Sequence, residues 1–355
     1  MLTVFPRLSG ALVLVLAASL ATAQSSGVQE GEPDLGKVGA AEGAAARSFA
    51  DDFEVGALVR VFWAYADDDL GNAVDGFGFH DIDMWAELPI DEYYFRASLE
   101  ADTGTAQLED AYLRYVKSEA LAVIGGSFKP RTLFSRSIDP ELLMFNERTL
   151  LGTFLDRWDI GVQASGKALE KFDYFASITN GSDGAQDDKL YAARVEGCLQ
   201  GEEVALQEGQ HGLPEEQDID VGVVFFQDAG DDATGIGVDV LARFEKLCVQ
   251  GEAMSLDEGL GGVVGLKTVP VVLDGDTVPW AVSASTMLSD TMQLAGRFQS
   301  TDNDAGTQIL SFALDYFPEG GSITFIAQVD RYDDDASNEG FVLQVGASMG
   351  RTRNR

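Results

Sequence analysis

The sequence predicts an all-β fold: a transmembrane antiparallel β-barrel of about 16 strands, with a long third loop folded into the lumen. Three observations predict it. Apolar residues recur at every second position through most of the chain. Short and long connections alternate between these runs. After the N-terminal segment, no window has the roughly 20 consecutive apolar residues of a spanning helix.

The first 23 residues predict a cleaved secretory signal peptide. They carry one positive charge, Arg7, then an apolar run from Gly10, and end in the small-x-small pattern Ala21-Thr22-Ala23. The apolar run is short for an uncleaved membrane anchor. Residues 24–50 are small and polar, which predicts a flexible periplasmic leader. Residues 51–355 remain for the barrel. A signal peptide before a barrel predicts export to an outer membrane of the Gram-negative type.

The charge of the chain excludes one class of partner. With 24 basic and 59 acidic side chains, its formal charge is −35. Removal of Arg7 with the signal leaves 23 basic against 59 acidic groups, or −36. Phosphate would repel such a chain, so we expect no nucleic-acid partner. Cys198 and Cys248 are the only cysteines, and the sequence leaves open whether they pair or lie apart on separate strands. No metal or cofactor is expected.

About sixteen alternating runs of roughly ten residues follow the leader. In the first, Val55, Val59 and Trp63 share an apolar face with every second residue between them, while Glu54 and Arg60 lie on the other face. Short connections on one rim and longer acidic ones on the other are typical of outer-membrane barrels. The stretch 201–217 breaks this rule, because it is too long for a tight turn. The runs begin near 53, 76, 92, 109, 119, 157, 171, 188, 218, 235, 246, 278, 291, 307, 322 and 340.

Alternation alone does not tell a barrel from a soluble β-sandwich, which buries its apolar face between sheets. The competing hypothesis is therefore an exported β-sandwich adhesin, or a surface module whose acidic loops bind calcium. Two features favour the barrel. Charged and small polar residues recur on the second face of nearly every run, and aromatics lie near run ends, as in interfacial girdles. These aromatics are Trp63, Tyr65, Tyr93, Phe95, Tyr115, Trp158, Tyr174, Trp280, Tyr316 and Tyr332.

A stretch of the chain, roughly residues 92–180, resembles the phosphate-selective porin O and P family. The resemblance rests on Asp110-Ala-Tyr112 in a strand, Gly126-Ser-Phe-Lys-Pro130 at a strand end, Glu147-Arg148 in the next loop, and Arg157-Trp-Asp-Ile-Gly-Val162 at a strand start. These elements occur in the family's order and at similar spacing. The resemblance implies a sixteen-stranded outer-membrane porin, usually a homotrimer in the lipid bilayer.

A pore selects solutes by its radius and by the charges that line it. The lumen of a sixteen-stranded barrel is wide, so a segment must narrow it. The longest gap between runs, 131–156, is the third long-rim loop, which folds into the lumen in the porins that the chain resembles. Its apolar stretches Leu142–Phe145 and Leu150–Phe154 would contact water if the loop lay over the rim, so we expect a constriction.

Basic residues on the lumen face and in this loop are the candidate pore-lining and constriction residues. They suit an anion path, because guanidinium groups bind phosphate oxygens in pairs. The sequence thus predicts passive diffusion of small hydrophilic solutes and ions, with anions such as phosphate as candidates. The candidates are Arg60, Arg96, Arg114, Lys129, Arg131, Arg136, Arg148, Arg157, Arg194, Arg243 and Arg297.

The alternative is that these arginines pair with carboxylates and only stiffen the wall. Acidic residues outnumber basic ones on the lumen face, which argues against strict phosphate selectivity. The carboxylates assigned to that face are Glu54, Asp81, Asp83, Glu87, Glu100, Glu196, Asp239, Asp315 and Asp330.

No enzyme is predicted. His80 and His211 are the only histidines, so histidine metal sites and most Ser-His-Asp schemes lack parts. We expect His80, beside Asp81 at the start of a run, at the rim. Asp81 and Asp83 share one strand face, as glycosidase carboxylates can, but any strand that lines water gives this pattern.

Overall fold

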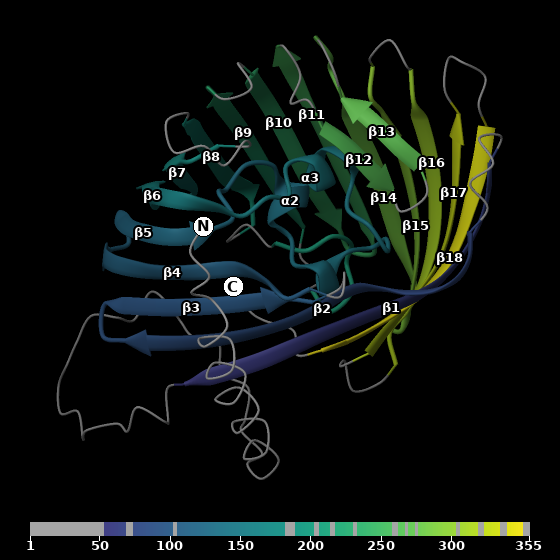
Figure 1. Ribbon diagram of the computed structural model, residues 1–355, viewed down its shortest axis with the longest axis horizontal. Helices are drawn as coiled ribbons and strands as arrows, with labels where there is room; N and C mark the ends of the chain where they lie inside the picture. The colour runs from purple at the N-terminus through teal and green to yellow at the C-terminus, as the bar shows by residue number, and fades with distance from the viewer. Residues whose placement is uncertain are drawn as a thin grey trace, which may run out of the picture.

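The computed structural model shows a closed antiparallel barrel of 16 strands, which confirms the predicted barrel (Figure 1). First and last strands pair, so the sheet has no open edge, and the β-sandwich is excluded. The structure describes residues 53–68, 74–101, 105–181, 189–201, 206–213, 217–229, 233–257, 262–266, 269–273, 276–302, 306–318, 323–333 and 339–350. The predicted signal peptide (1–23), the leader (24–50) and most of the acidic long-rim loops lie outside these residues.

Each strand of the wall pairs with its neighbours in the chain, apart from the closure between β1 and β18 and the step from β11 to β14. The wall strands are β1 (Glu54–Asp68), β2 (Val74–Ile90), β3 (Tyr93–Glu100), β4 (Gln107–Ser118), β5 (Leu121–Phe128), β6 (Asp159–Leu169), β7 (Phe172–Thr179), β8 (Leu190–Gln200), β9 (Asp218–Asp228), β10 (Ala233–Phe244), β11 (Leu247–Asp257), β14 (Trp280–Ser289), β15 (Met292–Ser300), β16 (Gln308–Tyr316), β17 (Ile323–Asp333) and β18 (Glu339–Gly350).

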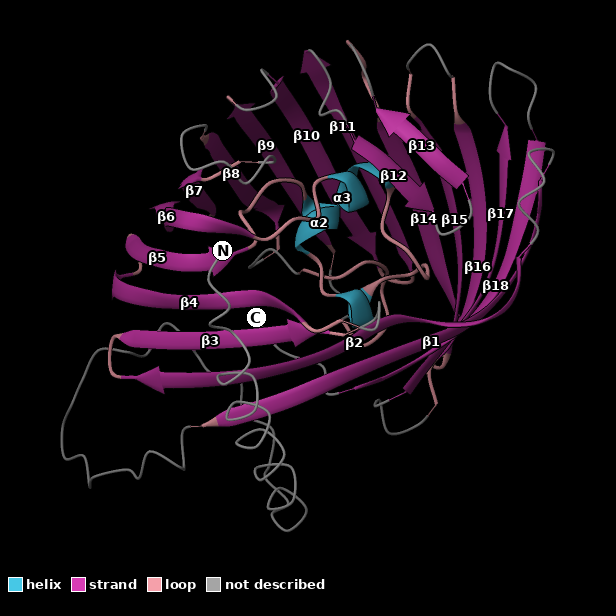
Figure 2. Ribbon diagram, in the orientation of Figure 1, coloured by secondary structure: helices cyan, strands magenta, loops and turns pink. Residues whose placement is uncertain are grey.

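Every wall strand begins within two residues of a predicted start. The sequence did not predict the separate hairpin of β12 (Gly262–Leu266) and β13 (Val269–Leu273), which pairs outside the wall. Its two strands are short apolar runs, in which the period-two signal is weak. Figure 2 shows that strands make up most of the described chain, with helices only inside the ring. Among the described residues, no helix is long and apolar enough to cross a membrane.

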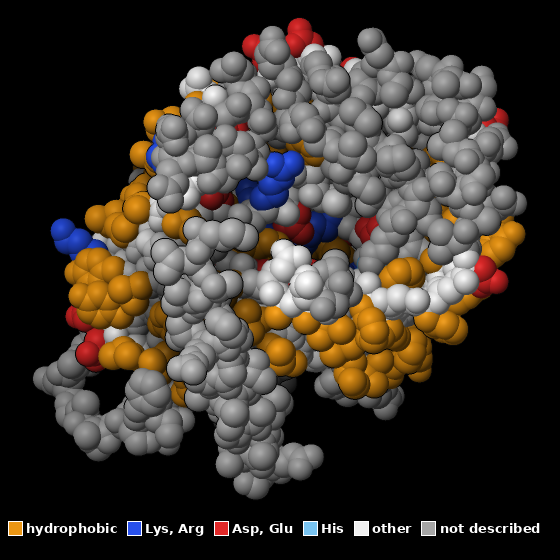
Figure 3. All heavy atoms as spheres, in the orientation of Figure 1, with side chains coloured by type: hydrophobic (Ala, Val, Ile, Leu, Met, Phe, Trp, Pro, Cys, Tyr) orange, Lys and Arg blue, Asp and Glu red, His pale blue; other side chains and the backbone are white. Residues whose placement is uncertain are grey.

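The burial pattern is the reverse of that of a soluble protein. On β10, Ile236, Val238 and Val240 are 57%, 51% and 41% exposed, whereas Asp239 between them is only 6% exposed. Arg194 and Arg297 are each 2% exposed. Figure 3 shows hydrophobic side chains at the outer edge of the molecule and charged ones in the hollow. An apolar outer surface around a charged interior is the arrangement of a lipid-embedded barrel.

The aromatic side chains only partly follow the predicted girdles. Tyr65, Tyr93 and Tyr115 are exposed on the outer surface, and the rings of Tyr93 and Tyr115 lie 5.2 Å apart. Tyr332 is 3% exposed and faces inward, so its assignment to a girdle was wrong. Trp158 was also assigned wrongly, because its indole Nε1 donates to Asp110 in the interior at 3.1 Å.

Two β-bulges change which side chains reach the lumen. Between the pairs Arg60–Asp81 and Val61–Phe79, β2 has one extra residue, His80. The bulge turns His80 inward, where it is 7% exposed and its Nε2 lies 3.3 Å from Gln344 Oε1. The prediction of a rim position for His80 was therefore wrong. It lies within β2 and faces the interior.

The second bulge lies between β3 and β4, where Ser98 faces both Glu109 and Asp110. In a regular strand, two consecutive residues point to opposite faces. Here both are buried, at 8% and 5% exposed, and both contact Ser98. This irregularity adds an inward carboxylate that the alternation of the sequence does not reveal.

The two cysteines are free and buried. Cys198 lies on β8 and Cys248 on β11, so β9 and β10 separate them in the wall. The structure therefore favours the unpaired alternative.

Candidate pore and constriction

The long connection between β5 and β6 lies within the ring of strands (Figure 1). It contains α2 (Phe134–Ser137), the 3-10 helix η3 (Pro140–Leu142) and α3 (Leu150–Phe154). Helix α3 begins at Thr149, whose side chain accepts a hydrogen bond from Gly152 N–H at 2.9 Å. We call residues 129–158 the inner loop.

Apolar side chains fix the inner loop against the wall of β8–β17. Leu133, Leu151 and Phe154 are at most 3% exposed and pack with inward side chains of β9, such as Val224 and Phe226. A second cluster joins the helix α2 region to β10 and β11, and its members are Phe134, Ile138, Leu143, Leu241 and Cys248. Burying these groups together keeps a large apolar surface out of the water of the lumen.

Polar contacts from five strands also hold the inner loop. Most of them satisfy a backbone group of the loop with a buried wall side chain, which fixes the position of the loop as well as its orientation. They are Arg60 to Asn146 O (2.7 Å), Asp239 to Phe134 N (2.9 Å), Glu252 to Ser135 Oγ (2.6 Å), Gln299 to Leu150 N (2.9 Å), Arg297 to Glu147 O (3.0 Å) and Gln328 to Asn146 N (2.7 Å).

Between the inner loop and β1–β4 lies a cavity of about 320 Å³, which we call the passage (Figure 3). Its wall residues include Arg60, His80, Asp81, Asp83, Trp85, Arg96, Ser98, Glu100 and Glu109. Its loop residues include Lys129, Arg136, Ser137, Asp139, Glu141, Asn146, Glu147, Arg148, Asp156 and Trp158.

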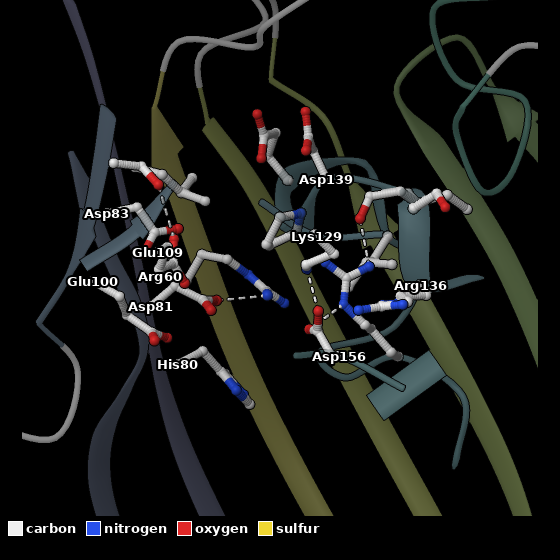
Figure 4. A pocket seen from close by; sticks show the side chains of 18 of the residues that line it. Arg60, His80, Asp81, Asp83, Glu100, Glu109, Lys129, Arg136, Asp139 and Asp156 are labelled. Atoms are coloured by element: carbon white, nitrogen blue, oxygen red, sulfur yellow. Dashed lines mark hydrogen bonds and ion pairs between the residues drawn. The ribbon is translucent and has the colours of Figure 1, made fainter. Parts of the chain in front are cut away.

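The strand side of the passage is acidic. Carboxylate oxygens of Asp83 on β2, Glu100 on β3 and Glu109 on β4 all lie within 4.8 Å of one another. Figure 4 shows these side chains on one side of the passage, facing Lys129 and Arg136 on the other. The alternation of the sequence predicts Asp83 and Glu100 on the lumen face but not Glu109, because the bulge at Ser98 brings Glu109 inward.

The loop side of the passage is a cationic cluster around Asp156. Lys129 forms an ion pair with Asp156, and Arg148 Nε donates to it at 2.9 Å. Burial lowers the pKa of Lys129 to about 8, although Asp156 opposes the shift. Burial alone would raise the pKa of Asp156, but Lys129 and Arg148 outweigh it and lower that pKa to about 2. Lys129 Nζ also lies 3.9 Å from the ring centroid of Trp158.

Ion pairs engage most of the candidate cations. Each of six arginines has a carboxylate oxygen within 2.9 Å, as expected for charges held away from water. The pairs are Arg60–Asp81, Arg96–Asp110 and Arg96–Glu87, Arg131–Glu196, Arg148–Asp156, Arg194–Asp239 and Arg194–Glu196, and Arg243–Asp218. The geometry therefore matches the alternative in which the arginines stiffen the wall.

The structure divides the predicted site residues into three groups. Arg60, Arg96, Lys129, Arg136 and Arg148 line the passage. Arg131, Arg194, Arg243 and Arg297 lie on the side that the inner loop covers, where Arg297 stacks 4.2 Å from the ring centroid of Phe145. Arg114 is half-buried on β4, and Arg157 is exposed before β6.

Formal charges in the passage favour negative potential. Its lining has eight carboxylates, Asp81, Asp83, Glu100, Glu109, Asp139, Glu141, Glu147 and Asp156, against five cations, Arg60, Arg96, Lys129, Arg136 and Arg148. The low-dielectric protein around the passage concentrates the resulting negative potential on the solution inside it.

No family model matches the chain, and no curated protein matches it in sequence. The resemblance to the phosphate-selective porins thus has no support from a family model. Among solved structures, the chain is similar to an anion-selective porin from Comamonas acidovorans, at 12% identity and a TM-score of 0.59, covering 84% of this chain and 99% of that one.

Two further solved structures are similar over most of their length. One is OmpT, an outer membrane protein of Vibrio cholerae, in its trimer form, at 11% identity and a TM-score of 0.58, covering 84% of this chain and 99% of that one. The other is OccK1 (OpdK) of Pseudomonas aeruginosa, at 10% identity and a TM-score of 0.52, covering 86% of this chain and 100% of that one. At such identities the similarity concerns the fold, so the chain has the barrel fold of outer-membrane porins.

Proposed function

We propose that the protein is an outer-membrane porin through which small hydrophilic solutes and ions diffuse passively. One observation carries the proposal: a closed ring of strands has an apolar outer surface and a charged interior that contains a cavity. Lipid around the ring and water within it explain both surfaces. The role requires no catalytic residue, and we propose none. It agrees with the predicted signal peptide and an outer-membrane location.

We further propose that the passage prefers cations. Carboxylates outnumber cations in its lining, and three of its arginines, Arg60, Arg96 and Arg148, already bind carboxylates. A paired guanidinium has fewer donors to offer to a phosphate, so anion transport would need arginines that are released from their partners. The preference for anions such as phosphate stays a prediction from the sequence, and the selectivity measurement below compares the two.

A homotrimer in the outer membrane is also a proposal. It rests on the family resemblance and on a similar barrel that has been solved in a trimer form. Chemical cross-linking of the protein in native membranes would test it, with a ladder ending at the trimer as the expected result.

Reversal potentials in planar bilayers test the proposed function. Purified protein should add stepwise conductance, and in a KCl gradient the potential should have the sign of cation flow. Absence of conductance would refute the porin. A reversal potential of the opposite sign, together with block of the chloride current by phosphate, would support the anion preference and refute the proposed cation preference.

A further inference from the structure

The connection between β8 and β9 differs from the other connections of its rim. Five connections on this rim are two-residue turns: 91–92, 119–120, 170–171, 245–246 and 290–291. By contrast, residues Leu206–Leu213 of the β8–β9 connection pack into the lumen, and Glu208 and Gln210 are each 4% exposed. We call Leu206–Leu213 the chord.

The chord crosses the mouth of the barrel at the short-turn rim. Near its start, Arg243 of β10 donates to the carbonyl oxygens of Gln207 (Nη2, 2.7 Å) and Gly209 (Nε, 3.3 Å). Farther on, Gln210 N–H donates to Gln293 Oε1 on β15 at 3.1 Å. The chord therefore passes across β10, β11, β14 and β15.

At its far end, the chord reaches the turn after β16. The ring of His211 stacks on Phe317, with centroids 3.6 Å apart and planes 7° from parallel. At Gly209, φ is +75°, and a Cβ there would lie 2.6 Å from the amide of Gln293. The positive φ favours glycine at this position, and a Cβ would also require the Gln293 amide to move.

The chord also joins the inner loop, which enters from the opposite rim. Glu208 N–H donates to Leu142 O at 3.1 Å, and Met144 N–H donates to Glu208 Oε2 at 3.0 Å. These two hydrogen bonds act in opposite directions between the same two segments. Leu206 adds an apolar contact with the cluster that contains Phe134 and Cys248.

We propose that the chord is a second constriction element. Together with the inner loop it closes the lumen beside β10–β16 and confines solute flow to the β1–β4 side, and Glu208 is the positioning residue that joins the two segments. This inference rests on the proposed porin function. It adds that the pore is off-centre and that a segment from the short-turn rim determines its size.

A matched pair of variants at Glu208 tests the joint. Glu208→Ala removes the acceptor for Met144 N–H, whereas Glu208→Gln keeps an acceptor oxygen and removes only the charge. Loss of one buried hydrogen bond should raise the undocked population about tenfold, seen as more frequent transient increases in single-channel current. Glu208→Gln should behave as the parent. If Glu208→Ala changes nothing, or both variants change alike, the positioning role is refuted.

The rate at which a reagent modifies Cys248 measures whether the chord and the inner loop close the lumen beside β10–β16. It is 0% exposed within the cluster that includes Leu206, so a charged methanethiosulfonate reagent should not modify it. In a Cys198→Ser background, Cys248 is the only thiol, and adding Glu208→Ala should raise its modification rate about tenfold. The reference is Glu100→Cys in a protein lacking both native cysteines, because position 100 lines the passage and should react rapidly.

Equal reaction rates at Cys248 and at the introduced thiol of the Glu100→Cys reference would refute the proposal that the lumen beside β10–β16 is closed. Far-UV circular dichroism checks that each variant retains its strands. Should Glu208→Ala not fold, Gly209→Ala disturbs the same segment through backbone strain and contact with Gln293. If the parent protein shows no conductance, the porin proposal fails, while thiol modification in detergent still tests whether the chord covers Cys248.

Discussion

Raising the pH through about 8 should make the passage more selective for cations, because Lys129 loses its charge there. Burial lowers the pKa of this lysine from 10.5 to about 8 in the folded protein. Below that pH, Lys129 is charged and offsets one carboxylate of the passage. Above it, the lysine is neutral, while Asp156 keeps its bond to Arg148 at 2.9 Å.

The size of the effect follows from Coulomb's law. One charge at roughly 7 Å in water contributes about 0.6 kcal/mol to the energy of a permeating ion. Screening at roughly 0.1 M salt halves this to about 0.3 kcal/mol. When Lys129 loses its charge, the permeability for cations rises and that for anions falls, each by about 1.7-fold. The cation-to-anion permeability ratio should therefore increase about threefold.

Reversal potentials at pH 6.5 and 9.5, chosen to lie about 1.5 units on either side of the pKa, measure this ratio. Lys129→Gln should respond to pH less than the parent does, because it lacks the titrating lysine. Any pH dependence that this variant retains belongs to other groups. The reasoning fails if Lys129→Gln responds to pH as fully as the parent does, since Lys129 would then not be the titrating group.

The stability of the protein should change in the same pH range. A lysine whose pKa is lower in the folded state than in the unfolded state destabilises the fold when it is charged. The free energy of unfolding should therefore rise as the pH increases from about 8 to the unfolded value of 10.5. Thermal unfolding of the parent and of Lys129→Gln at both pH values would detect the difference.

Three further predictions concern the acidic wall, the inner loop and the outer surface. Replacing Asp83, Glu100 and Glu109 by their amides should lower the cation-to-anion permeability ratio several-fold at pH 9.5, measured by reversal potential. Glu252→Leu removes the acceptor for two hydroxyls of the inner loop, which should cost about 2–4 kcal/mol of loop docking and increase single-channel conductance. Val238→Arg puts a charge on the lipid-facing surface and should cost about 2–4 kcal/mol, measured by denaturant unfolding in lipid vesicles.

The sequence was sufficient to predict most of the barrel wall, because alternation is a local property of each strand. A residue such as Val59 or Arg60 shows its face through its immediate neighbours, and register then follows from short turns. The apolar stretches of the inner loop likewise predicted that the loop packs inside the barrel, because they would otherwise contact water.

The bulges and the chord depend on contacts that no local pattern encodes. His80 and Glu109 reach the interior only because the neighbouring strand pairs out of register beside them. Glu208 meets Met144 across the lumen, 64 residues away in the chain. The length of 201–217 showed that this connection was unusual, but its Gly- and Glu-rich sequence does not reveal a destination inside the barrel.

The sequence grouped all of these arginines as pore-lining candidates, but in the structure some of them hold the inserted segments in place instead. A guanidinium held away from water is costly unless a carboxylate or carbonyl accepts from it. Arg194 and Arg243 meet this condition by binding acidic side chains of the wall, and Arg243 also binds the chord. Charges used in this way are fixed and largely neutralised, so they hold the two inserted segments in place and contribute little to the field in the passage. Under the proposed cation preference, selectivity would then depend on the carboxylates of β2–β4, which the inserted segments leave facing the solution.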